Sequence, residues 1–303
     1  MAKETTKFDL SIAFDDTEYL NPQIYLLTNT LKDNIPDDVT LHIVTNRKYG
    51  EDKPLTYLMD NIYSKVYYKE KDDELKSRCR YMFNCFDIQT KKDWVVKIEL
   101  DFIVLENISM LNDLLKDEYD LVIEPENRKI FTDNIEQRLW KNMFKAMGIK
   151  CPTHKITFRE NNEKGLPLYG TGMVCVKSKH LDTIQKRWKS LTKICEKWID
   201  YNVHPNEVAF TAMALDEEWN TYLYSNIYKY NPIGHWRDGP FPSVKLIDNP
   251  VLPEGTMIFD YHRPQWLMHT ANKIKSVGDA VCKSSEYIPE EWWKLTNKEF
   301  LEK

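Results

Sequence analysis

The feature that most constrains the fold is an alternation of short apolar runs with helical patterns along the first 126 residues. Apolar runs rich in β-branched and aromatic residues predict strands at residues 8–14, 39–46, 64–70, 95–105 and 119–126. Helical patterns separate these runs at residues 21–35, 54–63 and 71–88. Strands that alternate with helices form a mainly parallel sheet, because each connection crosses over the sheet. We therefore predict an α/β fold with helices on both faces of the sheet.

The second half of the chain is more mixed and ends in a loop-rich part. Helical patterns occur at residues 134–148, 180–200, 206–216 and 290–302, and strand patterns at residues 168–178 and 256–262. No internal repeat, low-complexity tract or Ser/Gly linker interrupts the sequence. We therefore predict one continuous domain over residues 1–303.

The composition is that of an ordinary soluble globular protein. Hydrophobic residues make up 42% of the chain, and a net charge of -5 gives no overall positive field for nucleic acid or acidic membranes. The first residues lack the apolar core of a signal peptide, and no run of about 18 apolar residues follows. The six cysteines form no CxxC pair, which predicts reduced thiols and a cytoplasmic location. No Gly-rich phosphate loop occurs, so a bound nucleotide must be held in another way.

Two carboxylates, Glu99 and Asp101, interrupt the apolar run at residues 95–105. In an extended chain, residues two apart point to the same side. Adjacent carboxylates at the end of a buried strand repel each other unless a cation lies between them. Mg²⁺ and Mn²⁺ suit such oxygen ligands and bridge to substrate phosphates. The pattern indicates a metal site, although a half-buried strand whose acids face water gives the same local pattern.

The step from Glu99 to Asp101, followed by the apolar "FIVLENISML", resembles the Asp-x-Asp signature of GT-A-fold glycosyltransferases. The resemblance implies a GT-A-like sheet and a nucleotide-sugar donor whose diphosphate is gripped by Mn²⁺ or Mg²⁺. Here Glu99 stands where the family has Asp. Its carboxylate binds the metal directly, through water, or not at all, and the sequence leaves these alternatives open.

Two later segments match the same family in order. Residues 168–178, "LYGTGMVCVKS", resemble the segment that lines the donor-sugar and acceptor site. The residues implied there are Gly170, Thr171 and Gly172. Glycine at two of these positions would let the backbone approach the substrate closely. Residues 206–215 resemble an acidic helix start that places Glu207 near the sugar.

The late segment "FDYHRPQWLMH" resembles the one that supplies a third metal ligand, a histidine, in several such families. His262 is the first candidate and His269 the second. The resemblance thus implies Glu99, Asp101 and His262 as metal ligands. It further implies contacts to the donor from Asn46, Arg80 and Arg263.

The implied reaction transfers a sugar from a nucleoside diphosphate, with UDP the first expectation, to an acceptor hydroxyl. An inverting enzyme needs a carboxylate base near that hydroxyl, for which Glu207 and Asp260 are candidates. A retaining enzyme needs no such base, and the order of motifs resembles retaining families somewhat more. Residues from about 1 to 126 would bind the nucleotide sugar, and residues from about 127 to 303 the acceptor.

The sequence leaves alternatives open for the acceptor and for the class of function. A saccharide or glycan is the first expectation for the acceptor, and a hydroxymethylated DNA base is the second, because residues 225–245 interleave aromatic and basic side chains. A nucleotidyltransferase also uses paired carboxylates, but "AFDDTEYLNP" after the first strand lacks its basic Gly-rich loop. A catalytically inactive GT-A-like nucleotide-binding protein would also be consistent with Glu99 in the motif.

Overall fold

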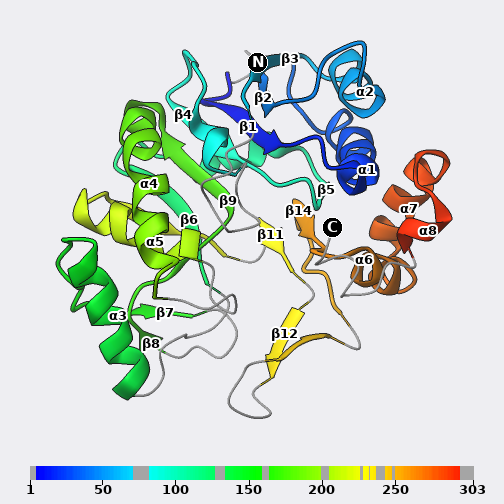
Figure 1. The fold of residues 1–303 in the computed structure, drawn as a ribbon. Helices are drawn as coiled ribbons and strands as arrows, with labels where there is room; N and C mark the ends of the chain where they lie inside the picture. Colours follow the sequence, from blue (N-terminus) through cyan, green and yellow to red (C-terminus); the bar gives the residue numbers. More distant parts are fainter. Residues whose placement is uncertain are drawn as a thin grey trace.

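The computed structural model describes residues 5–70, 82–126, 134–158, 164–198, 205–225, 228–231, 233–236, 243–247 and 250–293. Within these ranges a seven-stranded sheet in the order β10-β6-β9-β4-β1-β2-β3 forms the centre of the molecule (Figure 1). Its strands are β1 (Phe8–Phe14), β2 (Leu41–Thr45), β3 (Ser64–Tyr68), β4 (Trp94–Lys97), β6 (Leu121–Pro125), β9 (Tyr169–Lys177) and β10 (Thr221–Leu223). Strand β9 is antiparallel to β4 and β6, and the other neighbouring strands are parallel. The predicted mainly parallel sheet is confirmed.

Smaller sheets flank the central one. The first has the order β11-β14-β5, and two strand pairs join β12 to β13 and β7 to β8. Their bounds are β5 (Phe102–Val104), β7 (Ile156–Thr157), β8 (Lys164–Gly165), β11 (Lys229–Tyr230), β12 (Ile233–Trp236), β13 (Ser243–Leu246) and β14 (Ile258–Asp260). The prediction of a single strand at residues 95–105 is therefore wrong. The chain turns at Leu100 and Asp101, so β4 pairs in the central sheet and β5 pairs with β14 outside it.

Most of the described α-helices fall close to the predicted positions, but the two at residues 264–271 and 275–284 were not predicted from the sequence. The described α-helices are α1 (Asn21–Leu31), α2 (Lys53–Asn61), α3 (Asn134–Ala146), α4 (Leu181–Cys195), α5 (Pro205–Asp216), α6 (Pro264–Ala271), α7 (Lys275–Ser284) and α8 (Glu290–Trp293). Of the helix predicted at residues 71–88, residues 71–81 lie outside the described ranges, and Met82–Phe86 form the short 3-10 helix η2. The predicted closing helix is described only as α8. None of the described helices is both long and apolar enough to span a membrane.

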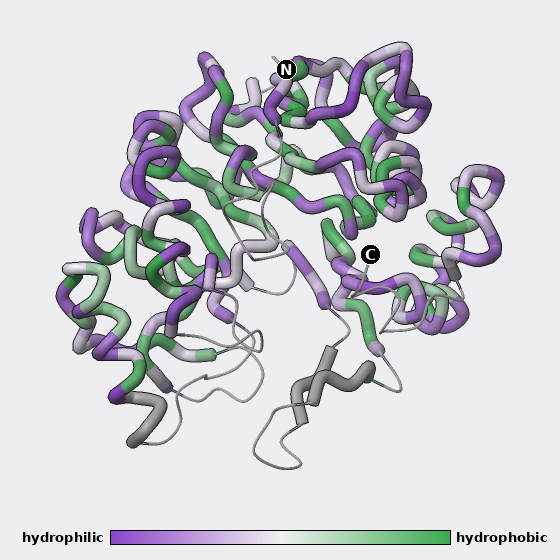
Figure 2. The backbone as a smooth tube through the Cα atoms, in the orientation of Figure 1, coloured by the Kyte–Doolittle hydropathy of each residue, from purple (hydrophilic) through white to green (hydrophobic). Residues whose placement is uncertain are grey.

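Both faces of the central sheet are covered, because alternate residues of each strand point to opposite sides. On β9, Val174 belongs to an apolar cluster with Trp188 of α4 and Phe210 of α5. Its neighbour Cys175 belongs to a second cluster with Ile24 of α1. Along the helices around the sheet, hydrophilic and hydrophobic residues accordingly alternate (Figure 2). The prediction of helices on both faces is confirmed.

The order of the strands places a crevice at the carboxyl ends of β1 and β4. The chain runs from β1 outward through β2 to β3, and then returns to β4 on the other side of β1. In open α/β sheets such a reversal leaves space for a ligand between the connections that leave the two strands. The residues that follow β1 and β4 are therefore the first place to look for a functional site.

Candidate active site

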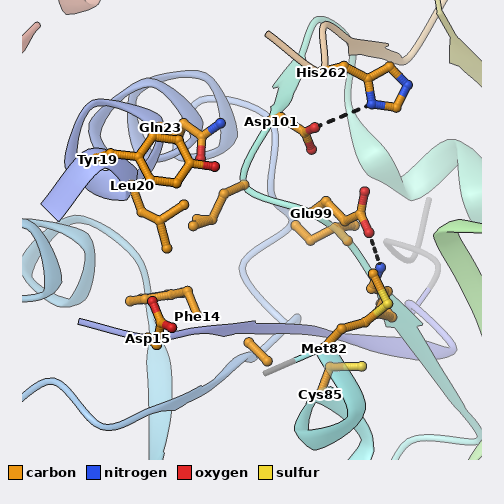
Figure 3. A pocket seen from close by; sticks show the side chains of 14 residues that line it. Phe14, Asp15, Tyr19, Leu20, Gln23, Met82, Cys85, Glu99, Asp101 and His262 are labelled. Carbon is orange, nitrogen blue, oxygen red and sulfur yellow. Dashed lines mark hydrogen bonds and ion pairs between the residues drawn. The ribbon is translucent and has the colours of Figure 1, made fainter. Parts of the chain in front are cut away.

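A cleft of about 290 Å³ opens at this reversal point. Its wall includes Asp15 after β1, Gln23 of α1, and Glu99 and Asp101 after β4 (Figure 3). The other lining residues are Ala13, Phe14, Tyr19, Leu20, Met82, Cys85, Lys97, Ile98, Leu100 and His262. The cleft thus brings the acid-x-acid motif and the late histidine into one site, although they are far apart in sequence.

One wall of the cleft, the segment after β1, is braced by the buried Arg47. The Arg47 guanidinium donates to the backbone carbonyls of Asp15 at 2.6 Å and Thr17 at 2.8 Å. It also donates to Asn21 Oδ1 at 2.6 Å and lies 3.0 Å from Asp52 Oδ2. These contacts fix the backbone that carries Asp15 into the cleft.

Three side chains beside the cleft have the composition and spacing of a metal site. Ligand atoms of Asp101, Asp260 and His262 all lie within 4.8 Å of one another. His262 Nδ1 is 3.6 Å from Asp101 Oδ2 and 3.6 Å from Asp260 Oδ1. The β5–β14 pairing brings them together, because the Tyr261 N–H donates to the Asp101 carbonyl at 3.1 Å.

The backbone at His262 is held in an unusual conformation. Its φ of 53° lies in the left-handed region, which is costly for a side chain with a Cβ. The Arg263 N–H donates to the Tyr261 carbonyl at 2.5 Å and closes a three-residue turn around His262. Such strain persists only where the surrounding structure imposes it, and it clusters at functional sites.

The electrostatics of this cluster suit a cation. Partial burial lowers the pKa of His262, but the carboxylates of Asp260 and Asp101 outweigh that effect and raise the pKa to about 9. Burial raises the pKa of Asp260, but His262 and Lys229 outweigh it, so the pKa lies below its usual range. Asp260 is therefore a fully buried carboxylate that is ionised at neutral pH.

Asp260 also leaves one oxygen for a ligand. Its side chain is 0% exposed; Oδ2 faces the ammonium of Lys229 at 2.7 Å, whereas Oδ1 faces His262 Nδ1 at 3.6 Å. The carboxylate of Asp101 lies within 4.8 Å of this buried carboxylate, and two acids so close are costly unless a cation lies between them. Carboxylates suit Mn²⁺ and Mg²⁺, and an imidazole is a common ligand of transition-metal ions, so this set favours Mn²⁺ of the two. The residues present therefore fit a divalent cation.

Glu99, the first acid of the motif, faces a different partner from Asp101 (Figure 3). Its Oε1 lies 2.5 Å from the ammonium of Lys97, the last residue of β4. Lys97 also donates to the carbonyls of Thr171 at 2.6 Å and Gly172 at 3.3 Å. No oxygen of Glu99 belongs to the set of candidate ligand atoms that contains Asp101.

A second buried lysine, Lys229 of β11, connects the metal cluster to the central sheet. Its ammonium lies 2.7 Å from Asp260 Oδ2 and 2.5 Å from Glu124 Oε1 on β6. Burial lowers the pKa of Lys229, but Asp260 and Glu124 outweigh it and hold the pKa well above its ordinary range. The lysine therefore stays charged and fixes the orientation of Asp260.

The predicted glycines, Gly170 and Gly172, lie inside strand β9. A Cβ on Gly172 would come within 2.5 Å of Lys229 Nζ, and a Cβ on Gly170 within 3.0 Å of Glu124 Cγ. The space above both glycines is thus filled by side chains of the protein itself. Thr171 between them is buried and accepts a hydrogen bond from Asn206 at 3.1 Å.

Glu207 lies at the start of α5, as predicted, with its carboxyl group turned inward. Its Oε2 is buried and has no hydrogen-bond partner among the residues that the structure describes. Burial raises the pKa of Glu207 well above its ordinary range, and the carboxylates of Glu126 and Glu99 raise it further. The raised pKa makes Glu207 a weaker acid than an exposed glutamate, and its predicted role as a base stays a prediction.

The remaining predicted residues have varied surroundings. Asn46 follows β2 and is not among the residues that line the cleft, and its buried Oδ1 has no partner in the described ranges. Arg263 follows His262 directly, and its guanidinium lies 4.5 Å from the centre of the Trp266 ring. Arg80 lies outside the described residues.

Part of the segment at residues 225–245 also lies outside the described ranges. The hydroxymethylated DNA base, which was predicted from that segment, therefore remains a prediction.

Several residues of the site are not marked by any motif in the sequence. Asp15 could have been found, because it follows β1 just as Glu99 follows β4, and carboxyl strand ends gather at one edge of the sheet. The sequence marks Lys97 more weakly, as a lysine in an apolar strand two residues before an acid. It does not mark Lys229 and Glu124, because their contact joins segments that share no local pattern.

Comparison with solved structures finds glycosyltransferases. The galactosyltransferase LgtC, solved in complex with donor and acceptor sugar analogs, has a TM-score of 0.56 and 12% identity, covering 94% of this chain and 98% of that chain. Mouse xyloside xylosyltransferase 1 has a TM-score of 0.53 and 11% identity, covering 84% of this chain and 97% of that chain. The glycosyltransferase GlyE of Streptococcus pneumoniae TIGR4 has a TM-score of 0.52 and 12% identity, and the match covers 95% of this chain and 66% of that chain.

The fold of this chain is therefore that of GT-A-type glycosyltransferases, as predicted from the sequence. At these identities the similarity is one of fold. No sequence-family profile matches the chain, and no curated protein matches it by sequence.

Proposed function

We propose that the protein is a metal-dependent glycosyltransferase that moves a sugar from a nucleoside-diphosphate donor to a hydroxyl of a saccharide or glycan. A UDP-sugar is the first candidate for the donor. One observation carries the proposal. Asp101, Asp260 and His262 converge at the reversal point of a GT-A sheet, beside a cleft large enough for part of a nucleotide sugar. This is where an oxygen-ligated cation would meet a diphosphate.

The proposed metal site differs from the one that the sequence resemblance implies. We assign Asp260 to the metal and not to proton transfer, because a fully buried carboxylate paired with Lys229 cannot reach an acceptor hydroxyl. Asp101 and His262 keep the roles expected for them. When bound, Mn²⁺ or Mg²⁺ would stabilise the negative charge that develops on the leaving diphosphate.

Other side chains bind and orient the donor. Arg263, next to His262, would place a positive charge near the diphosphate. Glu207, whose carboxyl group is turned inward at the start of α5, would contact the sugar or, in an inverting enzyme, serve as the base. Asn46 and Arg80 would contact the donor, and the backbone at Gly170, Thr171 and Gly172 would line the sugar. The residues up to about 126 would hold the donor, and those after it the acceptor.

A panel of nucleotide sugars with Mn²⁺ tests the proposal. Slow hydrolysis of a donor releases the free nucleoside diphosphate even when the acceptor is unknown. We expect release from one donor, its loss with EDTA, and its loss in Asp101→Asn. The matched control is Asp279→Asn, the same change at an exposed position of α7, which should keep the release.

Two outcomes would contradict the proposal. Metal-dependent thermal stabilisation by a nucleoside triphosphate in preference to any nucleotide sugar would favour a nucleotidyltransferase. Stabilisation by a nucleotide without any release of diphosphate, across donors and acceptors, would favour an inactive nucleotide-binding protein.

A further inference from the structure

The two acids of the motif are two residues apart, yet the structure gives them separate partners. Asp101 faces His262, and Glu99 faces Lys97 (Figure 3). The Lys97 side chain is 3% exposed, and its ammonium has three acceptors. They are Glu99 Oε1, the Thr171 carbonyl and the Gly172 carbonyl. An ammonium has three N–H donors, so each of them is used.

This arrangement ties Glu99 to the central sheet. Lys97 ends β4, and its two carbonyl acceptors lie on the neighbouring strand β9, so the ammonium cannot move without losing buried hydrogen bonds. Glu99 Oε1 is held with it. A metal ion that recruited this oxygen would have to break a buried ion pair, which leaves the lysine uncompensated at a high cost.

The place of a second acidic ligand is taken by Asp260. Its side chain is fully buried, and its Oδ1 lies 3.6 Å from His262 Nδ1. Its other oxygen is held by Lys229 at 2.7 Å. Lys97 thus holds the carboxylate of Glu99, and Lys229 holds that of Asp260, but only the carboxylate of Asp260 belongs to the set of candidate ligand atoms.

We infer that Lys97 is a positioning residue that keeps Glu99 out of the coordination shell, so that the ion is bound by Asp101, Asp260 and His262. The inference rests on the proposed function, because it assumes a divalent cation at this cluster. The motif then acts through its second acid alone, and Glu99 keeps Oε2 for other contacts in the cleft.

Titration with Mn²⁺ alone, followed by the EPR signal of the free ion, tests the inference without any substrate. The decisive variant is Lys97→Met/Glu99→Gln, which removes the ion pair without changing the net charge. It should keep a Kd for Mn²⁺ close to that of the wild type. Asp101→Asn and Asp260→Asn should each weaken the affinity by at least about ten-fold, because each removes a ligand.

The single variant Lys97→Met gives a result that a merely structural lysine would not produce. It frees Glu99 beside the cluster and removes a positive charge, so Mn²⁺ should bind about ten-fold more tightly. Adding Glu99→Gln to it should abolish the gain. Thermal unfolding of each variant checks that it is folded, and the charge-balanced double variant decides the matter if Lys97→Met alone does not fold.

Two results would overturn the inference, and they differ from failure of the proposed function. If the double variant loses Mn²⁺ affinity as Asp101→Asn does, Glu99 is a ligand. If Asp260→Asn keeps the wild-type affinity while Asp101→Asn loses it, the ligand set is wrong. If Asp101→Asn itself leaves Mn²⁺ binding unchanged, the metal site and the proposed function fail together.

Discussion

Phe102 lies opposite Asp260 in the antiparallel register of β5 and β14. This pairing sets Asp101, one residue before Phe102, beside His262, two residues after Asp260, and the Tyr261 N–H donates to the Asp101 carbonyl. The candidate metal site is therefore built outside the central sheet, by a small sheet that joins the middle of the chain to its end. Substitutions that weaken this pairing should therefore disturb the metal site more than the central sheet.

The left-handed backbone at His262 predicts that glycine at this position gives a more stable protein than alanine. His262→Gly and His262→Ala both remove the imidazole, but only glycine adopts a φ of 53° without strain. The Gly variant should therefore have a free energy of unfolding about 1 kcal/mol higher than that of the Ala variant. Urea denaturation measures the difference, and both variants should lose Mn²⁺. Equal stability of the two would show that the backbone at this position is not strained.

The close approach of Lys229 to β9 predicts that Gly172 tolerates no side chain. A Cβ there would meet Lys229 Nζ at 2.5 Å, and the ammonium cannot retreat without leaving Glu124 and Asp260. Gly172→Ala should therefore lower the free energy of unfolding by about 1–3 kcal/mol. It should also weaken Mn²⁺ binding, because Asp260 loses its support. Unchanged stability and unchanged Mn²⁺ binding would contradict the described position of Lys229.

The buried Asp9 should make the stability of the fold sensitive to acid. Burial raises its pKa, but hydrogen bonds from His42 at 3.2 Å and Thr90 at 2.5 Å, with the Thr40 N–H, outweigh that effect and lower the pKa. A carboxyl group whose pKa is lower in the folded state stabilises the fold above its unfolded pKa, about 3.9. That contribution is lost as the pH falls through the folded value.

Asp9→Asn isolates this contribution. At pH 7 the variant should be less stable than the wild type by about 1.5–3 kcal/mol, the contribution of hydrogen bonds to a charged group. The gap should narrow as the pH falls below about 4. Urea denaturation across this range measures the gap, and a gap that stays constant with pH would contradict a lowered pKa for Asp9.

Much of the fold follows from local patterns in the sequence. Strands such as Phe8–Phe14 and helices such as Leu181–Cys195 were predictable because apolar residues recur with the period of each element. The break after Lys97 was not, because the apolar run continues through it and only the distant partner of Phe102 shows where the second strand belongs. Local patterns contain no information about pairing partners.

The candidate site was predictable in part for the same reason. Asp101 and His262 stand out as polar residues beside apolar strands, and the structure brings them together. Asp260 was noticed as an acid, but its place among the candidate ligand atoms depends on the β5–β14 register. The partner of Glu99 depends on two carbonyls of β9, which no motif marks.

The central claim is that a divalent cation at Asp101, Asp260 and His262 binds the diphosphate of a nucleotide. Calorimetric titration of UDP into the protein, with and without Mn²⁺, tests it most directly, using the wild type, Asp101→Asn and Asp279→Asn. The wild type and Asp279→Asn should bind UDP at least about ten-fold more tightly with Mn²⁺, and Asp101→Asn should show no such gain. A gain of equal size in Asp101→Asn would contradict the claim.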